Sequence, residues 1–513
     1  MSEISRTAHI VKNARTSLFF SVATLFLGFF SRKIFIDCLG IEVLGLNSTA
    51  VNLLGFLNLA ELGINGAVSF TLYTPLFKKD YDTVSDIVAV QGWLYRRIAY
   101  VVLTGGAVLM CFFPLFFAKI ELPLWYAYGS FGILLVSAML GYIVNYQQIV
   151  LSASQQEYKI TTNVQGFRVL KQIIQIVGIG FLGFGYVYWL VVELVGSVIS
   201  CIFLNRTIRK NFPWLRPDLS QGKELSQKYP EIILKTKQLF FHKFAGFALN
   251  QANPLIIYAF LSLTVVAIYG NYMLLIVSVS TLINSMFSGV TAGIGNLVAE
   301  GNRSKILSFF REYTIGRYWL ASVVCFCLFN LSNPFISIWI GEQYLLDSAS
   351  FILLVAYAFI ALTRTNEIFT AAYGLFHDIY APVAEAVLNL GLSILLGYYW
   401  GLPGILSGVL ISLILVVHCW RPYFLFTRGF HVSVWKYVVL VCKIITIIAA
   451  SWIICQYITG SENSCDTLTE WLLLSMKMLF IYGVISFSLF WMVSKDFRAT
   501  IRRVCKITGE FMQ

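Results

Sequence analysis

The sequence predicts an all-α protein that crosses a membrane many times. Of its 513 residues, 58% are hydrophobic and only 12% are charged, whereas a soluble chain carries roughly 25% charged residues. So little charge leaves too few polar side chains to cover a water-soluble globule, which means that lipid surrounds most of the chain. Aromatic residues make up 16%, and this is typical of membrane proteins because Trp and Tyr anchor helices at the headgroup level.

Long apolar runs predict the number of membrane spans. A helix that crosses the ~30 Å hydrocarbon core needs about 20 mainly apolar residues, and on that criterion the sequence predicts about fourteen transmembrane helices. They are expected near residues 16–38, 43–72, 93–117, 124–148, 160–182, 184–205, 236–260, 264–290, 315–340, 349–373, 380–400, 403–426, 435–458 and 471–494. The first run reaches Arg32 and Lys33 without a small-residue cleavage site, so we expect an uncleaved helix rather than a signal peptide.

The positions of the basic residues predict the topology. The net charge is +12, but Lys and Arg recur in short clusters between apolar runs rather than in one stripe. This pattern argues against a nucleic-acid partner and favours the charge asymmetry that orients membrane helices. If the N-terminus is cytoplasmic, the basic clusters fall in inner loops and in the C-terminal tail. They lie at 78–79, 96–97, 206–216, 303–317, 421–436 and 495–506. We therefore expect both termini in the cytoplasm.

A polar segment at 206–237 divides the chain after the sixth span, and short motifs recur on either side of it. VLGLN (43–47) is matched by AIYGN (267–271), and VGSVIS (195–200) by SGVLIS (407–412). These repeats predict a duplicated core with six helices in each half, followed by two further helices. The expected parts are an N-lobe at 1–206, a cytoplasmic linker at 207–235, a C-lobe at 236–428, two helices at 429–494 and a basic cytoplasmic tail at 495–513.

Several stretches resemble one known family, and they follow the family's order over most of the chain. They are RKIFIDCLGIEVLGLNSTAVNLLGFLNLAELGINGAVSFTLYTPLFKKDYD (32–82), YGNYMLLI (269–276), GIGNLVAEGN (293–302), FISIWIGEQYLL (335–346), AAYGLFHDIYAP (371–382) and GLPGILSGVLIS (401–412). The resemblance is to the polysaccharide transporter branch of the multidrug, oligosaccharidyl-lipid and polysaccharide exporter superfamily, which includes the O-antigen and capsule repeat-unit flippases.

This resemblance implies two six-helix lobes around a basic central cavity that opens to each side of the membrane in turn. The implied activity is flipping of a polyprenyl-diphosphate-linked oligosaccharide from the inner to the outer leaflet of the bacterial cytoplasmic (inner) membrane, for O-antigen, capsule or exopolysaccharide synthesis. A polysaccharide polymerase and other synthesis proteins are possible partners, beside membrane lipid. One departure is present: where the family's seventh helix often carries an acidic–Asn pair, this chain has Gln251 to Pro254, so ion coupling at that place is not implied.

Basic residues at membrane depth are candidates for the headgroup site. An ionisable side chain in the hydrocarbon costs several kcal/mol unless it faces a cavity or a partner. Arg168 and Lys171 are three residues apart on one face of the span near 160–182, where they either bind a diphosphate or, for Arg168, reach the interface as a helix-end charge. Further cationic candidates are Lys243, Arg32 and Arg364. For Arg32, interfacial anchoring is the alternative to a second phosphate contact on the exit side.

Polar residues recur at helical spacing on the seventh span. His242, Asn250 and Asn253 lie on one stripe, which either lines a cavity or packs against a neighbouring helix. Pro254 follows and predicts a kink in this helix.

Two further spans carry acidic candidates. On the second span, Asn58 and Glu61 lie near one another, and Glu61 either carries a coupling ion or serves as the structural partner of a base such as Lys171. On the tenth, Arg364 and Glu367 are three apart, which favours a mutual ion pair over ion coupling by Glu367.

Several enzyme signatures are missing from the sequence. There is no Gly-rich phosphate loop, no large outer loop with the paired acids that a membrane polymerase or ligase needs, and no metal-ligand spacing among the ten cysteines. We therefore expect a transporter with no catalytic residues, cofactor or metal. The alternatives are a cation-coupled multidrug antiporter of the same superfamily, a polysaccharide polymerase or ligase, and a non-transport membrane scaffold.

Overall fold

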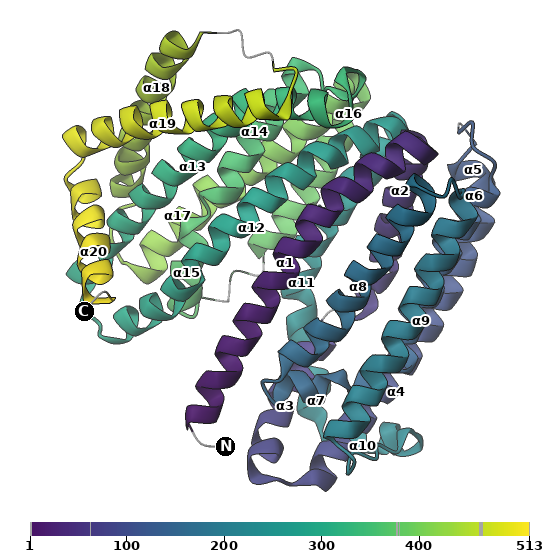
Figure 1. Ribbon diagram of the computed structural model, residues 1–513. Coiled ribbons are helices and arrows are strands. Elements are labelled where there is room, and N and C mark those ends of the chain that lie inside the picture. The colour runs from purple at the N-terminus through teal and green to yellow at the C-terminus, as the bar shows by residue number, and fades with distance from the viewer. Residues whose placement is uncertain are drawn as a thin grey trace. The chain divides into compact units, whose positions relative to one another are not determined.

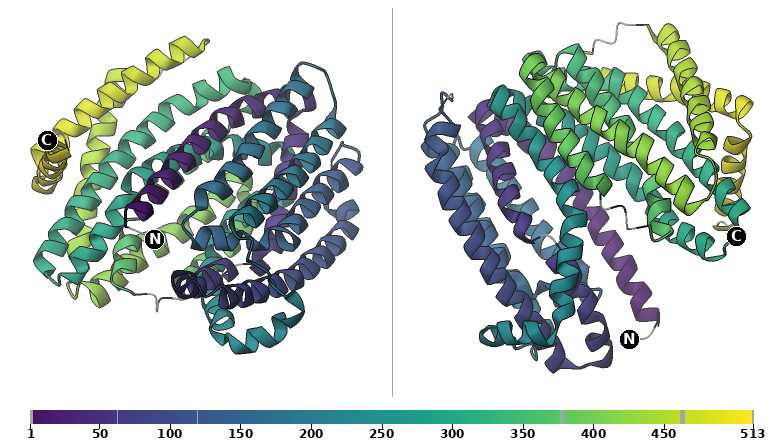
Figure 2. Two further views of the ribbon diagram at one scale, coloured as in Figure 1. Left: turned by 60° about the horizontal axis from the view of Figure 1, so that its bottom comes forward. Right: turned by 180° about the vertical axis from the view of Figure 1, so that it is seen from behind.

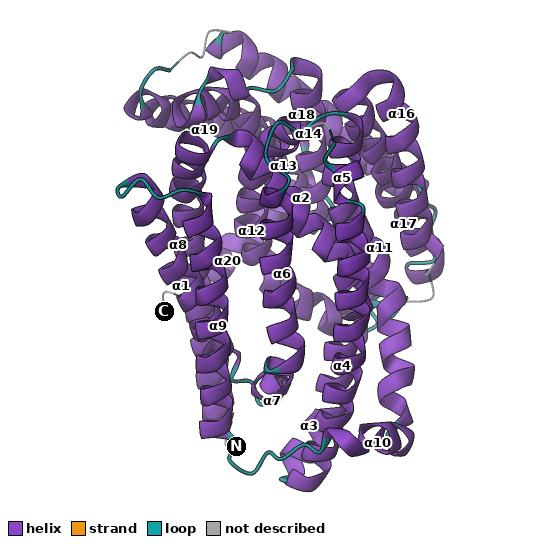
Figure 3. Ribbon diagram, turned by 90° about the vertical axis from the view of Figure 1, so that its right-hand side faces the viewer, coloured by secondary structure: helices purple, strands orange, loops and turns teal. Residues whose placement is uncertain are grey.

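The computed structural model describes residues 3–61, 63–118, 120–375, 378, 380–460 and 465–511. Within this part of the chain every regular element is a helix (Figure 3). The chain divides into two compact units, Met1–Ala267 and Ile268–Gln513. The all-α, multi-pass fold class that the composition predicts is therefore confirmed.

Unit 1 is a bundle of long helices joined by short turns (Figure 1). Its elements are α1 (Glu3–Leu39), α2 (Ile41–Leu57), a 3₁₀ turn (Asn58–Glu61), α3 (Ile64–Lys78), α4 (Tyr81–Cys111), α5 (Phe113–Phe116), α6 (Trp125–Ile143), a 3₁₀ turn (Asn145–Gln148), α7 (Ile149–Ala153), α8 (Glu157–Gly180), α9 (Tyr186–Asn211), a 3₁₀ turn (Leu219–Gln221), α10 (Gly222–Lys228) and α11 (Pro230–Phe260).

The helices of unit 1 pack in a consistent order. Helix α1, the dark purple helix in Figure 2, lies along α8. Helix α8 in turn packs against α9, and α2 and α4 both contact α6. Helix α11 packs on α2 and α3, so the seventh predicted span belongs to this unit by its contacts. Fully buried apolar side chains such as Leu46, Val88 and Phe131 fill the space between these helices.

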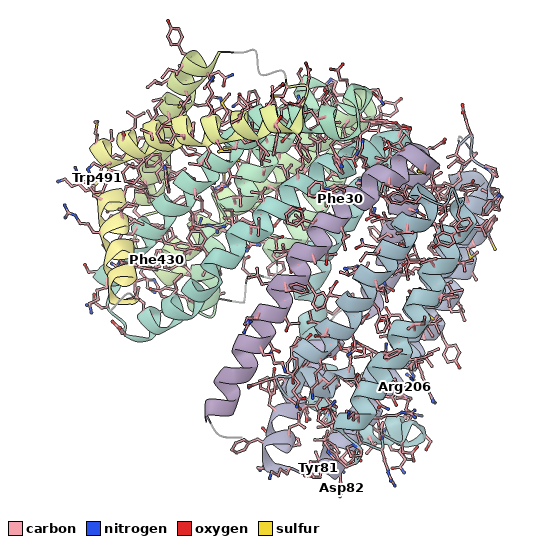
Figure 4. The ribbon with its side chains drawn as sticks, in the orientation of Figure 1. Phe30, Tyr81, Asp82, Arg206, Phe430 and Trp491 are labelled. Atoms are coloured by element: carbon pink, nitrogen blue, oxygen red, sulfur yellow. The ribbon has the colours of Figure 1, made fainter. Side chains whose placement is uncertain are left out.

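The segment that was expected to be a polar linker is folded onto α4. Gly222 approaches the Trp93 side chain so closely that a Cβ would lie 2.3 Å from it. Lys228 forms an ion pair with Asp86 at 2.8 Å, and the hydrogen bond from this lysine to Asp86 raises the pKa of Lys228 to about 12. The end of α9 that carries Arg206 and the start of α4 (Figure 4) lie at the same end of unit 1 as α10 (Figure 1). Basic residues of α9 (Arg206, Arg209, Lys210) and of α10 (Lys223, Lys228) therefore lie at this end.

Unit 2 begins within the first turns of α12 and contains the helices that follow it. Its elements are α12 (Leu263–Ala299), α13 (Arg303–Ile340), a 3₁₀ turn (Glu342–Tyr344), α14 (Ser348–Leu362), α15 (Thr365–Ala372), α16 (Tyr380–Leu413), a π-helical segment (Ile414–Trp420), α17 (Arg421–Phe424), a second π-helical segment (Leu425–Gly429), α18 (Trp435–Thr459), α19 (Leu468–Val493) and α20 (Lys495–Phe511).

Within α16 the chain turns back on itself at Gly401, whose φ of 61° and ψ of −135° lie outside the helical region. The two arms then pack with almost no side chain between them, because a Cβ on Gly404 would lie 2.0 Å from the Leu396 carbonyl oxygen and one on Gly408 would lie 2.4 Å from the Ser393 backbone nitrogen. Glycine is required at such close approaches of two backbones.

Ten helices in the described part of the chain are long and apolar enough to cross a membrane. The prediction of about fourteen spans counts, in addition, the α2–α3 pair, α8 and α11, and it counts the region Tyr380–Gly429 as two spans instead of one. This count stays a prediction. Large apolar side chains on the outer faces of these helices are exposed, such as Phe30 at 63% and Trp491 at 36% (Figure 4). Such surfaces are stable in lipid and unstable in water.

The contact between the arms of α16 generates a stability prediction. We expect Gly408→Ala to lower the midpoint of thermal unfolding in detergent, because the new methyl group overlaps backbone atoms and costs at least about 1–3 kcal/mol. Gly391→Ala is the matched control, since a Cβ at Gly391 meets nothing within 4 Å. Equal midpoints for the two variants would contradict the close packing of the arms.

Candidate functional site

A cavity of about 780 Å³ lies inside unit 1. Its walls come from α3, α6, α7, α8 and α9 together with the 3₁₀ turn Asn145–Gln148. Helix α7 lies toward the end of unit 1 that also holds α10 (Figure 3), so part of the wall is close to the basic end of the unit.

Hydroxyl and amide side chains supply most of the polar lining. They include Asn65, Ser69, Asn145, Gln148, Thr161 and Gln165. The lining residues of α8 recur at helical spacing along one face of that helix. The polar residues of α8, five of which line the cavity (Glu157, Thr161, Gln165, Arg168 and Lys171), lower its mean hydropathy, and α8 is not among the ten apolar helices.

Both basic residues that the sequence predicts on the fifth span line this cavity. Arg168 is exposed, and its Nη1 donates to Gln165 Oε1 over 3.3 Å. The partner in that hydrogen bond is a neutral amide. Among the described residues, no acid therefore pairs with the guanidinium, and most of its five donors can still bind a ligand.

Lys171 is held differently, because its ammonium forms an ion pair with Glu193 of α9 at 2.5 Å. The two side chains are only 16% and 23% exposed. Gln175 is buried one turn further along α8, and its amide donates to Glu193 Oε2 over 3.2 Å. The sequence reasoning offered Glu61 as a partner for Lys171, whereas the structure provides Glu193 instead. A lone acid in the middle of the apolar sixth span was the signal that would have identified it.

Glu61 belongs to a separate network of neutral hydrogen-bonding groups. The Tyr95 hydroxyl lies 2.8 Å from both Glu61 Oε1 and Asn65 Oδ1, and the Asn65 amide donates to Glu61 over 3.1 Å. Because Asn65 also lines the cavity, this network reaches the cavity wall. Asn58 lies close by and accepts a hydrogen bond from Tyr142 over 2.9 Å.

The other candidates in unit 1 are placed apart from this cavity or are not described. Arg32 donates to the Ala267 carbonyl over 3.3 Å and is not among the described lining residues. The side chains of His242, Lys243 and Asn250 lie outside the described residues. Asn253 on α11 is buried at 8% exposure, and among the described residues its Oδ1 has no hydrogen-bond partner.

Arg364 and Glu367 lie in unit 2, where they form part of a network of four charges. Arg364 pairs with Glu367 at 3.4 Å and with Glu385 at 3.1 Å. Arg421 reaches the same two acids at 3.4 Å and 3.7 Å. The Glu385 side chain is 4% exposed and therefore buried, whereas Arg364, Glu367 and Arg421 are partly exposed at 34%, 28% and 21%. We name this arrangement the four-charge network; its two arginines and two glutamates cancel in charge.

Irregular backbone positions the two arginines of the four-charge network. Arg364 lies at the break between α14 and α15, with a non-helical ψ of 52°. Arg421 follows the π-helical segment Ile414–Trp420, where a wider turn shifts the side chains from their α-helical positions. The sequence spacing predicts the Arg364–Glu367 pair, but Glu385 and Arg421 are distant in sequence and join it only through the fold.

Comparisons with known proteins identify the fold. No family model and no curated protein sequence matches the chain. A solved structure of the lipid II flippase MurJ in an inward closed conformation matches with a TM-score of 0.65 at 15% identity, over 93% of this chain and 99% of that one. An inward-facing multidrug resistance MATE family transporter of the MOP superfamily matches with a TM-score of 0.56 at 17% identity, over 78% of this chain and 93% of that one. The chain therefore shares the fold of these polytopic membrane transporters.

The four-charge network generates a prediction about stability. We expect Glu385→Gln to lower the free energy of unfolding by about 1.5–3 kcal/mol, because the buried Glu385 carboxylate accepts a charge-assisted hydrogen bond from Arg364 and is one of two acids that balance the two arginines. Thermal unfolding in detergent measures the change. Lys305→Ala is the control, since the Lys305–Glu300 pair is exposed at 64% and 57% and such pairs contribute less than about 1 kcal/mol. A Glu385→Gln midpoint equal to that of the control would show that the network contributes little to stability.

Proposed function

We propose that this protein is a flippase that moves a polyprenyl-diphosphate-linked oligosaccharide from the inner to the outer leaflet of the bacterial cytoplasmic membrane, for surface polysaccharide synthesis. The observation that carries the proposal is the cavity in unit 1, where Arg168 and Lys171 of α8 lie among hydroxyl and amide side chains. The sequence predicts that this helix spans the membrane. The shared fold with a lipid II flippase supports the proposal.

The two basic residues suit the charged part of such a substrate. A guanidinium presents a planar set of donors that matches phosphate oxygens, and an ammonium adds a compact second charge. In the low-dielectric surroundings of a membrane protein these contacts are stronger than in water. Arg168 and Lys171 are therefore the proposed diphosphate-binding residues.

The neutral lining suits the sugars. Asn, Gln, Ser and Thr side chains donate and accept hydrogen bonds without demanding a charge, as glycan hydroxyls require. The lining also includes apolar side chains such as Leu140, Ile160 and Phe167. The exposed apolar faces of the helices let the polyprenyl tail stay in the bilayer. The cavity therefore has basic partners for the diphosphate and neutral polar partners for the sugars of such a substrate.

Transport follows if the lobes predicted at 1–206 and 236–428 expose the cavity alternately to the two sides. With cytoplasmic termini, an inside-negative potential favours the outward movement of a negatively charged headgroup by about 2.3 kcal/mol per charge per 100 mV. This driving force needs no coupled ion. Ion coupling through Glu61 or Glu367 stays a prediction, as does assembly with a polysaccharide polymerase.

A cation-coupled multidrug antiporter is the second candidate. The shared fold with a MATE transporter favours it, and so does the carboxylate of Glu193 beside the cavity, because a carboxylate binds an organic cation. The two proposals differ in the charge of the substrate: an antiporter needs the acids of the cavity wall, and a diphosphate flippase needs its bases.

Substitution of the basic residues tests the flippase. In a strain that lacks the flippase of the matching glycan gene cluster, the wild-type chain is expected to restore the surface glycan. Arg168→Ala and Lys171→Ala are each expected to lower it by about tenfold, since a hydrogen-bonded contact to a charged group contributes about 1.5–3 kcal/mol. Quantitative detection of surface glycan measures the effect.

Lys210→Ala is the matched control for these variants. Lys210 is an exposed base at the end of α9 in the same unit, outside the described lining of the cavity, and its loss is expected to leave glycan export unchanged. Full export by well-expressed Arg168→Ala and Lys171→Ala would remove both residues from the site. Failure of a correctly inserted wild-type chain, together with drug resistance conferred by it, would favour the antiporter.

A further inference from the structure

The ion pair between Lys171 and Glu193 gives the cavity a property that its basic residues alone do not predict. Arg168 and Lys171 are the bases among the described lining residues, and Glu157 is the acid among them. Glu193 adds a second acid in direct contact with Lys171. The charges of these four side chains cancel in sum, so Lys171 meets an entering diphosphate as a compensated base, whereas Arg168 contacts only a neutral amide among the described residues.

The pair is held on several sides. The Lys171 side chain lies over Gly196, where a Cβ would be 2.8 Å from Lys171 Cδ, so only glycine leaves room for it. Gln175 donates to the second oxygen of Glu193 over 3.2 Å and to the Trp189 carbonyl over 3.1 Å. The Glu193 carboxylate is therefore fixed at both oxygens, and it fixes the Lys171 ammonium in turn.

This arrangement still allows Lys171 to bind an anion. An ammonium has three donors, and Glu193 Oε1 accepts one of them. The other two remain for phosphate oxygens, with the carboxylate opposing the attraction at close range. A transporter needs such opposition, because a site that binds its substrate too tightly releases it too slowly.

We propose that Glu193 is a counter-ion that positions Lys171 and sets the affinity of this cavity for a diphosphate, weakening the bound state so that the substrate is released. This inference rests on the proposed flippase function and adds a residue to it. Glu193 acts through Lys171 and is a positioning residue. The proposed role predicts that removal of the Glu193 charge strengthens substrate binding and slows export. Lys171→Ala is expected to have the opposite effect on binding and to weaken it.

The test measures binding and export with the full-length protein. Binding of farnesyl diphosphate to the purified protein in detergent, by titration calorimetry, is compared for the wild type and Glu193→Gln. We expect the Kd of Glu193→Gln to be about tenfold lower than that of the wild type, since the freed ammonium gains a charge-assisted contact. In the glycan complementation assay the same variant is expected to export less than the wild type.

Two further variants separate this role from a general effect of charge or folding. Glu157→Gln removes an acid from the same cavity without freeing Lys171, and its Kd is expected to fall less than that of Glu193→Gln. In the double variant Lys171→Gln/Glu193→Gln the gain in affinity is expected to vanish, because Lys171 is the group through which Glu193 acts. Thermal unfolding of each variant shows whether it is folded.

The outcomes distinguish the inference from the function on which it rests. If the wild type binds farnesyl diphosphate and Arg168→Ala weakens that binding, but Glu193→Gln binds no tighter, the counter-ion role of Glu193 is overturned and the flippase proposal stands. The same conclusion follows if the double variant keeps the gain. If the folded wild type binds no farnesyl diphosphate, both proposals are overturned.

Discussion

Charge in hydrocarbon is the constraint on which this structure depends. An ionised side chain at the centre of a bilayer costs several kcal/mol unless a partner or a polar cavity compensates it. A helical membrane protein can therefore keep such residues only where the fold provides compensation. The two units of this chain provide it in different ways, and the difference indicates which unit is organised for binding.

In unit 2 the charges compensate one another. Arg364, Arg421, Glu367 and Glu385 form a closed network with Glu385 almost fully buried. Each charge in this network already has an opposite partner, so a charged ligand would have to displace one of them, and removing one partner of a buried pair is costly. In unit 1, by contrast, Arg168 contacts only a neutral amide among the described residues and lines a cavity. An anionic substrate could therefore supply the negative charge that compensates its guanidinium.

Sequence reasoning predicted the fold class correctly and named two of the residues that line the candidate cavity. The scarcity of charge predicted a polytopic helical protein, and the three-residue spacing of Arg168 and Lys171 placed both on the face that lines the cavity. Spacing along one helix is a local property, and it can be read directly from the sequence. The folded linker at α10 was not anticipated, because its contacts with α4 come from Trp93 and Asp86, which lie far away in the sequence.

The partners of the charges were beyond the sequence for the same reason. Glu193 meets Lys171 from another helix, and Glu385 meets Arg364 from the first arm of α16. Arg421 joins the same two acids only after the chain has turned at Gly401 and passed through a π-helical segment. Periodicity shows which residues share a face of one helix, and it does not show which face of another helix lies opposite. From the sequence, the basic residues alone predicted a positively charged cavity. The structure adds the acids Glu157 and Glu193, which balance that charge.

The central claim is that the cavity of unit 1 binds the diphosphate of a lipid-linked sugar. The most direct test is an experimental structure of the protein in a lipid nanodisc with undecaprenyl diphosphate added. The account predicts density for the diphosphate within hydrogen-bonding distance of the Arg168 guanidinium and the Lys171 ammonium, with the lipid tail leaving the cavity toward the bilayer. Density for the diphosphate at another place, with the cavity holding only water, would contradict it.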